Sequence, residues 1–391
     1  MKASRGVLAA AWLAAAGLAA ASCAHAPPRA VSPVVAAAAD TSGESSEAGA
    51  LTLFYVTDRA PAGRPDPRRF FGREWGELAF GRAAVRIPPR ERLARLARSG
   101  RSLRSPGTPI KQVVLESLTP MSADSFLAEV AAAVGRSKGR RALVFVHGYN
   151  MPFERALRFT AQLERGLGES CVAILYGWPA TRSYLADEEA VRWSEPDLEA
   201  FLTRLADRIG AGSIDLLGYS MGTRAVMGAL GSAAVTPAAG AAGVAGDPAP
   251  DRDSAAAGDA AGLAAGARFG QVVLAAPDLE SRTFARDVPR VARAARRLTL
   301  YASSRDRALR VSRAAHGHAR AGQAGRDLLL LPGLDTIDVT EVRSDLTGHG
   351  YLEELIGDLE LLLGQDTPPD RRPGLTRATS GGRDYWRMSR K

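Results

Sequence analysis

The sequence has 391 residues, of which 46% are hydrophobic and 24% charged, and its formal net charge is +9. This length suits one large domain or two small ones, and no aromatic–basic motif supports nucleic-acid binding, so none is expected. The two cysteines, Cys23 and Cys171, lie outside any Cys-x-x-Cys or Cys/His pattern, which argues against a zinc site. Because Cys171 leads an apolar run, we expect it to be a buried structural thiol.

Residues 1–22 have the pattern of a signal peptide. Lys2 and Arg5 precede an almost unbroken apolar run over residues 7–21, which is shorter than the roughly 20 residues that a membrane span needs. The run Ala20-Ala21-Ser22-Cys23 resembles the lipobox of bacterial lipoproteins, although Ala is found where Leu is commonest. It predicts lipidation of Cys23 and a membrane-anchored protein of the bacterial cell envelope. An ordinary secretory signal, giving a soluble secreted or periplasmic protein, is the alternative.

Three stretches have too few large apolar residues to offset the entropy of an ordered chain. Residues 23–49 are rich in Ala, Pro and Ser, and predict a flexible tether. Residues 233–266 predict a low-complexity insertion, and residues 365–391 a basic flexible tail that is solvated or touches anionic lipid headgroups. A folded domain is therefore expected over residues 50–364.

Within this domain, short apolar runs alternate with segments of helical periodicity. Strands are predicted at residues 51–57, 83–87, 112–118, 142–146, 172–176, 213–218, 271–276, 298–302 and 336–342. Helices are predicted at residues 152–167, 187–209, 221–230 and 351–363. The alternation predicts an α/β fold with a mainly parallel central sheet and helices on both faces. Functional residues are then expected just after the carboxyl ends of the strands.

The run Gly218-Tyr219-Ser220-Met221-Gly222 joins a predicted strand to a predicted helix. Gly-x-Ser-x-Gly at such a sharp turn indicates a nucleophilic serine, Ser220. Acyl transfer also needs two amides that stabilise an oxyanion, and we expect these from Met221 and from Tyr149 in the loop after another strand. His147, in the same loop, is expected to shape the loop through hydrogen bonds and not to act as the base.

The base is predicted to be His349, which lies between two glycines after the last predicted strand. A loop histidine of this kind titrates near neutral pH, which suits proton transfer to and from a serine. His316 and His318 form a His-x-His pair, but no third metal ligand is evident beside them, so no metal site is predicted.

Two aspartates follow strands between Ser220 and His349 and could orient the histidine. Strand counting favours Asp306, which follows the penultimate strand, and Asp278 is the alternative acid. Asp345 lies only four residues before His349 and is expected to cap its loop.

Five segments together resemble a known family. They are Phe54-Tyr55-Val56-Thr57-Asp58-Arg59, Phe145-Val146-His147-Gly148-Tyr149-Asn150, Gly177-Trp178-Pro179, Gly218-Tyr219-Ser220-Met221-Gly222 and Ala276-Pro277-Asp278. Over about residues 51–363 the chain resembles bacterial esterase/lipase-like α/β-hydrolases of poorly defined function. The resemblance implies the α/β-hydrolase fold, a Ser220–Asp306–His349 triad and hydrolysis of carboxylic esters, with Asp58 and Arg59 in structural roles.

The sequence thus predicts a serine esterase or lipase that needs no cofactor or metal. Its expected partners are a small acyl-ester or lipid substrate and, through the N-terminal lipid anchor, a membrane. The same triad could instead serve an acyltransferase or an amidase. A non-catalytic envelope lipoprotein that keeps the hydrolase scaffold is a further alternative.

Overall fold

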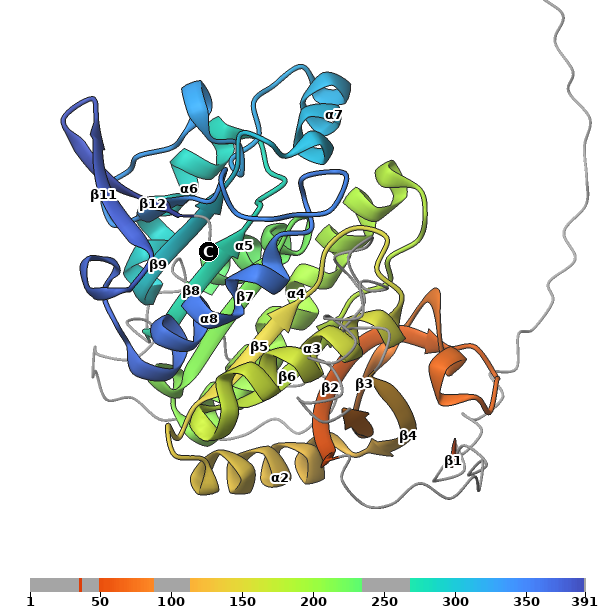
Figure 1. The fold of residues 1–391 in the computed structure, drawn as a ribbon. Coiled ribbons are helices and arrows are strands. Elements are labelled where there is room, and N and C mark those ends of the chain that lie inside the picture. The colour runs from red at the N-terminus through yellow and green to blue at the C-terminus, as the bar shows by residue number, and fades with distance from the viewer. Residues whose placement is uncertain (1–34, 37–48, 88–112, 234–267, 390–391) are drawn as a thin grey trace, which may run out of the picture. The chain divides into compact units, whose positions relative to one another are not determined.

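The computed structural model describes residues 35–36, 49–87, 113–233 and 268–389 (Figure 1). These residues belong to one unit, Val34–Lys391. The predictions for the signal peptide and for Cys23 lie outside them, as does nearly all of the insertion predicted at residues 233–266.

The strands of the described residues form one sheet. They are β1 (Val35–Ala36), β2 (Gly49–Pro61), β3 (Phe71–Ile87), β4 (Val114–Met121), β5 (Ala142–Val146), β6 (Val172–Gly177), β7 (Ile214–Tyr219), β8 (Phe269–Ala275), β9 (Ala295–Ala302), β10 (Asp335–Asp338), β11 (Leu375–Ser380) and β12 (Arg383–Met388). Their spatial order is β1-β4-β3-β2-β6-β5-β7-β8-β9-β10-β12-β11. Every neighbouring pair from β2·β6 to β10·β12 is parallel. We call the edge where these parallel strands end the carboxyl edge, and the opposite one the amino edge.

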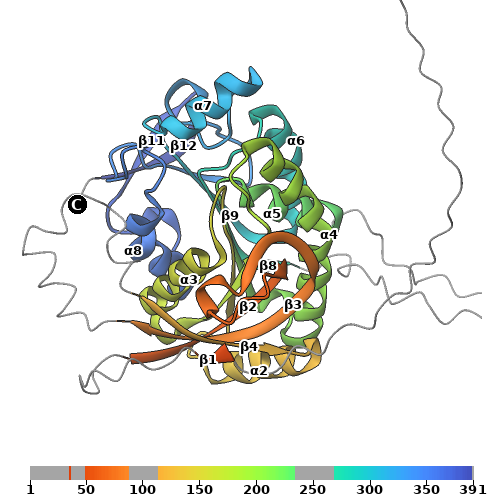
Figure 2. The same cartoon turned by 90° about the vertical axis from the view of Figure 1, so that its right-hand side faces the viewer.

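Helices cover both faces of this sheet. They are α2 (Ala123–Arg136), α3 (Phe153–Leu167), α4 (Tyr184–Ile209), α5 (Gly222–Ala233), α6 (Ser281–Ala294), α7 (Arg307–His316) and α8 (Ile356–Leu359). Figure 2 shows α3 and α8 on one side of the sheet, and α4, α5 and α6 on the other.

The core divides into two layers because successive strand residues point to opposite faces. In β5, Val144 packs in the layer beneath α2, α4, α5 and α6, whereas Leu143 and Phe145 pack in the layer beneath α3 and α8. All five residues of β5 are buried. This burial on both faces explains the continuous apolar run that predicted the strand, and the predicted α/β fold with a mainly parallel sheet is confirmed.

Several predicted elements differ from the observed ones in their bounds. β3 begins at Phe71 and not at residue 83, because its first half consists mostly of partly exposed and polar residues and lacks the apolar run of a core strand. α2 was not predicted; it buries Phe126, Leu127, Val130 and Val134. The helix predicted at residues 351–363 is a 3₁₀ turn η6 (Leu352–Leu355), α8 and a π turn η7 (Glu360–Gly364).

The flexible tail predicted at residues 365–391 is wrong for most of its length. β11 and β12 form a hairpin there, joined by Gly381 and Gly382 with φ of 55° and 73°. β12 lies parallel to β10, with Trp386 opposite Ile337. The buried Tyr385 and Trp386 supply the apolar contact that the arginine-rich composition obscured. Likewise, β1 pairs with β4 inside the tether predicted at residues 23–49.

The thiol of Cys171 is 3% exposed and lies just before β6, so the prediction of a buried structural cysteine is confirmed. Burial raises the pKa of this thiol, which disfavours the reactive thiolate. Among the helices of the described residues, none has the length and apolar character needed to cross a bilayer.

Candidate active site

Ser220 occupies the turn between β7 and α5 at the carboxyl edge. Its backbone has a φ of 52°, in the left-handed region that a non-glycine residue adopts at a cost of about 1–3 kcal/mol. The turn is fixed on both sides, because the Ser220 amide donates to the Ala275 carbonyl at 2.8 Å and the Thr223 hydroxyl donates to the Ser220 carbonyl at 2.5 Å. The strained turn therefore presents the Ser220 hydroxyl at the end of the sheet.

The loop after β10 brings His349 to this hydroxyl. The Nε2 atom of His349 is 2.9 Å from the Oγ atom of Ser220. The amides of His349 and Gly350 both donate to Asp345 Oδ1 at 3.1 Å, as expected for a loop cap. The hydroxyl of Tyr219 donates to the His349 carbonyl at 3.0 Å. The imidazole is thus held from its own loop and from the strand that precedes Ser220.

Asp306 completes a chain of hydrogen bonds. Its Oδ2 atom is 2.6 Å from Nδ1 of His349, and its Oδ1 atom accepts from the Leu309 amide at 2.9 Å, which caps the start of α7. The side chain is buried, so these donors and the helix N-terminus take the place of water around the carboxylate. Asp306 thereby orients the Nδ1–H tautomer of His349, which leaves Nε2 as an acceptor facing Ser220.

The charges around His349 set its basicity. Burial lowers the pKa of the imidazole, whereas the negative charge and hydrogen bond of Asp306 raise it. The carboxylates of Asp278 and Asp345 act in the same direction. The pKa of His349 is therefore raised above the ordinary histidine value, which makes it a stronger proton acceptor than a free imidazole.

The predicted oxyanion amides lie on two backbone segments that contact each other. A Cβ atom on Gly148 would be 2.8 Å from the Cβ atom of Ser220, and one on Gly222 would collide with the His147 carbonyl. Only glycine allows this approach at either position. Within the described residues, the amides of Met221 and Tyr149 donate no hydrogen bond.

His147 supports this loop from within the core. Its ring stacks on Trp178 with centroids 4.9 Å apart, and its Nε2 atom lies 3.1 Å from a guanidinium nitrogen of Arg59. Burial and the Arg59 charge lower the pKa of His147 to about 3, so the ring is neutral and cannot serve as a solvent-accessible base. Arg59 also donates to the Met151 carbonyl at 2.8 Å. The sequence resemblance implies a structural role for Arg59 but does not predict its contacts with His147 and Met151.

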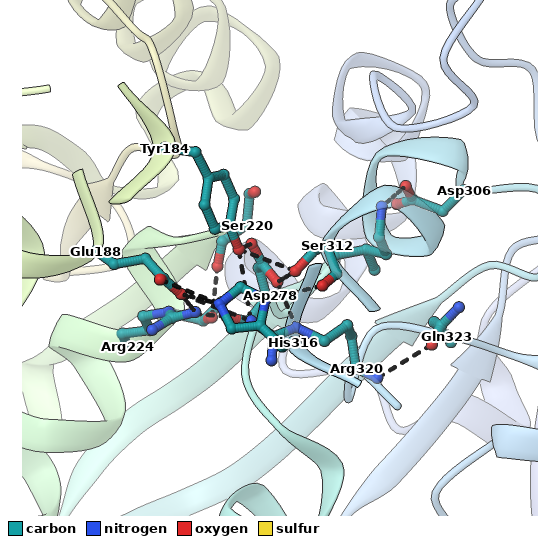
Figure 3. Close-up of polar contacts among 12 residues, drawn as sticks. Tyr184, Glu188, Ser220, Arg224, Asp278, Asp306, Ser312, His316, Arg320 and Gln323 are labelled. Carbon is teal, nitrogen blue, oxygen red and sulfur yellow. Dashed lines mark hydrogen bonds and ion pairs between the residues drawn. The ribbon is translucent and has the colours of Figure 1, made fainter. Parts of the chain in front are cut away.

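Asp278 lies beside the site but bonds elsewhere (Figure 3). Its Oδ1 atom accepts from Arg320 Nε at 2.8 Å and from the Ser312 hydroxyl at 2.6 Å, while Oδ2 accepts from the Tyr184 hydroxyl at 2.5 Å. Burial raises the pKa of Asp278, but the Arg320 charge and these hydrogen bonds outweigh burial. The pKa of Asp278 therefore lies below its usual value. The structure gives Asp278 no hydrogen bond to His349 among the described residues.

Glu188 extends this polar cluster away from Ser220. Its carboxylate accepts from Arg224 at 2.5 Å and lies 3.1 Å from Nε2 of His316 (Figure 3). Arg224 also donates to the Asp278 carbonyl at 2.8 Å. Glu188, Arg224 and His316 also line a cavity of about 660 Å³ beside α5, whose other lining side chains are mostly charged and polar. Within the described residues, no three His, Cys, Asp or Glu side chains are placed to hold a metal ion.

The sequence also matches a known family of this fold. A family model described as "Alpha/beta hydrolase of unknown function (DUF900)" matches residues 122–356. This range is more than half of the chain and contains Ser220, Asp306 and His349. No curated protein and no solved structure matches the chain. The match agrees with the observed fold and leaves the substrate open.

Proposed function

Because the chain belongs to the family of α/β hydrolases of unknown function (DUF900), we propose that it is a serine hydrolase that cleaves carboxylic esters through an acyl-enzyme. The observation that carries this proposal is the unbroken chain of hydrogen bonds from Asp306 through His349 to Ser220, at 2.6 Å and 2.9 Å. A scaffold protein has no physical need for this arrangement at a strained turn.

In the first half of the proposed reaction, Ser220 Oγ attacks the ester carbonyl carbon while its proton passes to Nε2 of His349. The carbonyl oxygen becomes an oxyanion, which accepts from the amides of Met221 and Tyr149. The tetrahedral intermediate then collapses, the carbon–oxygen bond to the leaving group breaks, and His349 returns the proton to the departing alcohol.

In the second half, a water molecule gives a proton to His349 and attacks the acyl carbon. The bond to Ser220 breaks, Ser220 Oγ regains the proton, and a carboxylic acid leaves. Asp306 stays ionised throughout and stabilises the imidazolium that forms in each half. The proposed reaction uses only groups of this chain and water.

The proposal is tested with p-nitrophenyl esters of graded acyl length and the full chain. We expect turnover by the wild type and at least about a 10³-fold lower rate for Ser220→Ala. An added alcohol that diverts acyl groups from the acid to a new ester would favour an acyltransferase. Anilide turnover that exceeds ester turnover would favour an amidase. A folded wild type without turnover of any of these substrates would contradict the proposal.

A further inference from the structure

The exposed large apolar side chains of the described residues are concentrated at the carboxyl edge. They are Trp75, Val114, Tyr149, Leu185, Trp193, Val311 and Leu346. Val114 is the first residue of β4 and pairs with Arg86 near the end of β3. It therefore lies at the amino edge. The other six lie on segments around the candidate active site. Single exposed apolar residues are ordinary on a protein surface, but a group of this kind marks an interaction site.

Tyr149 and Leu185 lie on one side of Ser220. Tyr149 belongs to the loop that approaches Ser220 at Gly148, and its hydroxyl donates to the Arg182 carbonyl at 2.8 Å. Its ring is 5.5 Å from that of Tyr184, the first residue of α4. Leu185 follows directly, and 73% of its surface is exposed.

Val311 and Leu346 lie on the other side. Leu346, 91% exposed, precedes His349 by three residues, and its loop bonds to the start of α7 through the Arg307 amide and the Thr347 carbonyl at 2.8 Å. Val311, 70% exposed, follows on α7. Its neighbour Ser312 lies 2.9 Å from the Tyr184 hydroxyl, which connects this side of the surface to Leu185.

Two tryptophans extend the surface along α4. Trp193 is 67% exposed and lies about two helical turns after Leu185 on the same helix. Its ring packs at 6.4 Å against that of Trp75 in the β2–β3 hairpin. Trp75 pairs with Arg59, whose side chain reaches the loop of His147, so the hairpin belongs to the same edge.

The charge of this surface is mainly positive around α7. The helix has no acidic residue, and it carries Arg307, Arg310 and Arg313 at exposed positions around Val311. Only Arg313 of these forms an ion pair among the described residues, with Asp327 at 2.5 Å. α7 buries Leu309 against the protein core, and its solvent side combines arginines with the apolar Val311, a combination that suits contact with anionic headgroups.

We propose that the carboxyl edge docks on an anionic lipid bilayer. In this arrangement Leu185, Val311 and Leu346 enter the headgroup region, and the arginines of α7 lie against lipid phosphates. The positive charge of α7 favours a bilayer over a second copy of this chain that would bring two α7 helices together. Docking at this edge goes beyond ester hydrolysis and is separate from the lipid anchor predicted at Cys23.

The test compares two matched substitutions, Val311→Asp at the carboxyl edge and Val114→Asp at the amino edge. Both are made in the full chain carrying Cys23→Ser, so that no acyl chain contributes and any effect of the apolar N-terminal run is common to all variants. Co-sedimentation is measured with vesicles of equimolar phosphatidylcholine and phosphatidylglycerol. We expect Val311→Asp to weaken partitioning by about tenfold relative to Val114→Asp, because a carboxylate replaces an apolar contact and faces anionic headgroups.

Further arms identify the binding surface. Leu185→Asp should reproduce the effect of Val311→Asp, and high salt or pure phosphatidylcholine vesicles should weaken binding of the parent chain. Ser220→Ala should leave binding unchanged, so failure of the proposed hydrolysis would not alter the result. Equal partitioning of the Val311→Asp and Val114→Asp chains would overturn the proposal. So would a dimer that Val311→Asp dissociates with no change in vesicle binding.

Discussion

Two buried aspartates follow neighbouring strands at the carboxyl edge, and they have different partners. Asp306, after β9, gives one carboxylate oxygen to His349 and the other to the first turn of α7. Asp278, after β8, gives both oxygens to Arg320, Ser312 and Tyr184. Both lie in chain order between Ser220 and His349, so their positions along the chain do not distinguish them.

The difference shows that hydrogen-bond partners decide which carboxylate can act with a histidine. Asp278 is fully occupied by donors of its own cluster, and its charge reaches His349 only through space. Asp306 contacts His349 directly and is held in place by α7. We therefore propose a catalytic role for Asp306 and a stabilising role for Asp278.

The largest effect is expected from Asp306→Asn. Asparagine caps a helix about as well as aspartate, so α7 should keep its first turn. The amide cannot stabilise an imidazolium or hold the Nδ1–H tautomer, so kcat should fall by about 10³- to 10⁴-fold. Steady-state hydrolysis of a p-nitrophenyl ester measures the loss, and the melting temperature serves as the control. A fall of less than tenfold would assign the acid role elsewhere.

Asp278→Asn should have the opposite profile. It removes the nearer of the two carboxylates that pair with Arg320, whose side chain is 3% exposed, and leaves Glu188 at 3.7 Å. The free energy of unfolding should fall by about 3 kcal/mol, measured by urea denaturation, while kcat at low temperature stays within about tenfold of the wild type. A loss of kcat as large as that of Asp306→Asn, with unchanged stability, would reverse the two assignments.

The pH dependence of activity also distinguishes the roles of Asp306 and Asp278. Protonated His349 cannot accept the Ser220 proton, so kcat/KM should fall as the pH drops through its raised pKa, above the ordinary histidine value. Removing the Asp306 charge should move this acid limb to lower pH. Removing the Asp278 charge should move it the same way by less, since Asp278 acts without a hydrogen bond. An acid limb unmoved by Asp306→Asn would show that another group titrates.

The smallest effect is expected from Ser312→Ala. It removes one of the donors to Asp278 and leaves Arg320 and Tyr184 in place, so stability should fall by about 1 kcal/mol. Ester hydrolysis should be unchanged within about twofold. A clear loss of activity here would mean that the Asp278 cluster positions Asp306 through α7.

Much of the fold and of the candidate site follows from local sequence patterns. Strands buried on both faces read as continuous apolar runs, and the motif around Ser220 marks the strand-to-helix turn that the structure contains. Strand counting also favoured Asp306, which the structure brings to His349. These features depend on neighbouring residues along the chain, which is why the sequence alone predicts them.

Features that depend on distant partners were missed. The donors that occupy Asp278 come from α4 and from α7 and the loop after it, and Arg59 reaches His147 across 88 residues of chain. The β11–β12 hairpin was obscured by its arginines, although Gly381-Gly382 between two short segments is a turn signal. Pairing and burial at long sequence separation leave little trace in composition or periodicity.

The central claim is that His349 activates Ser220, and labelling of the full chain with a fluorophosphonate probe tests it most directly. The wild type should be labelled on the peptide that contains Ser220, as mass spectrometry of the digest can show. Labelling should be lost in Ser220→Ala and in His349→Ala, and kept in Asp278→Asn. Labelling that persists in folded Ser220→Ala, or a folded wild type that takes up no probe, would contradict the account.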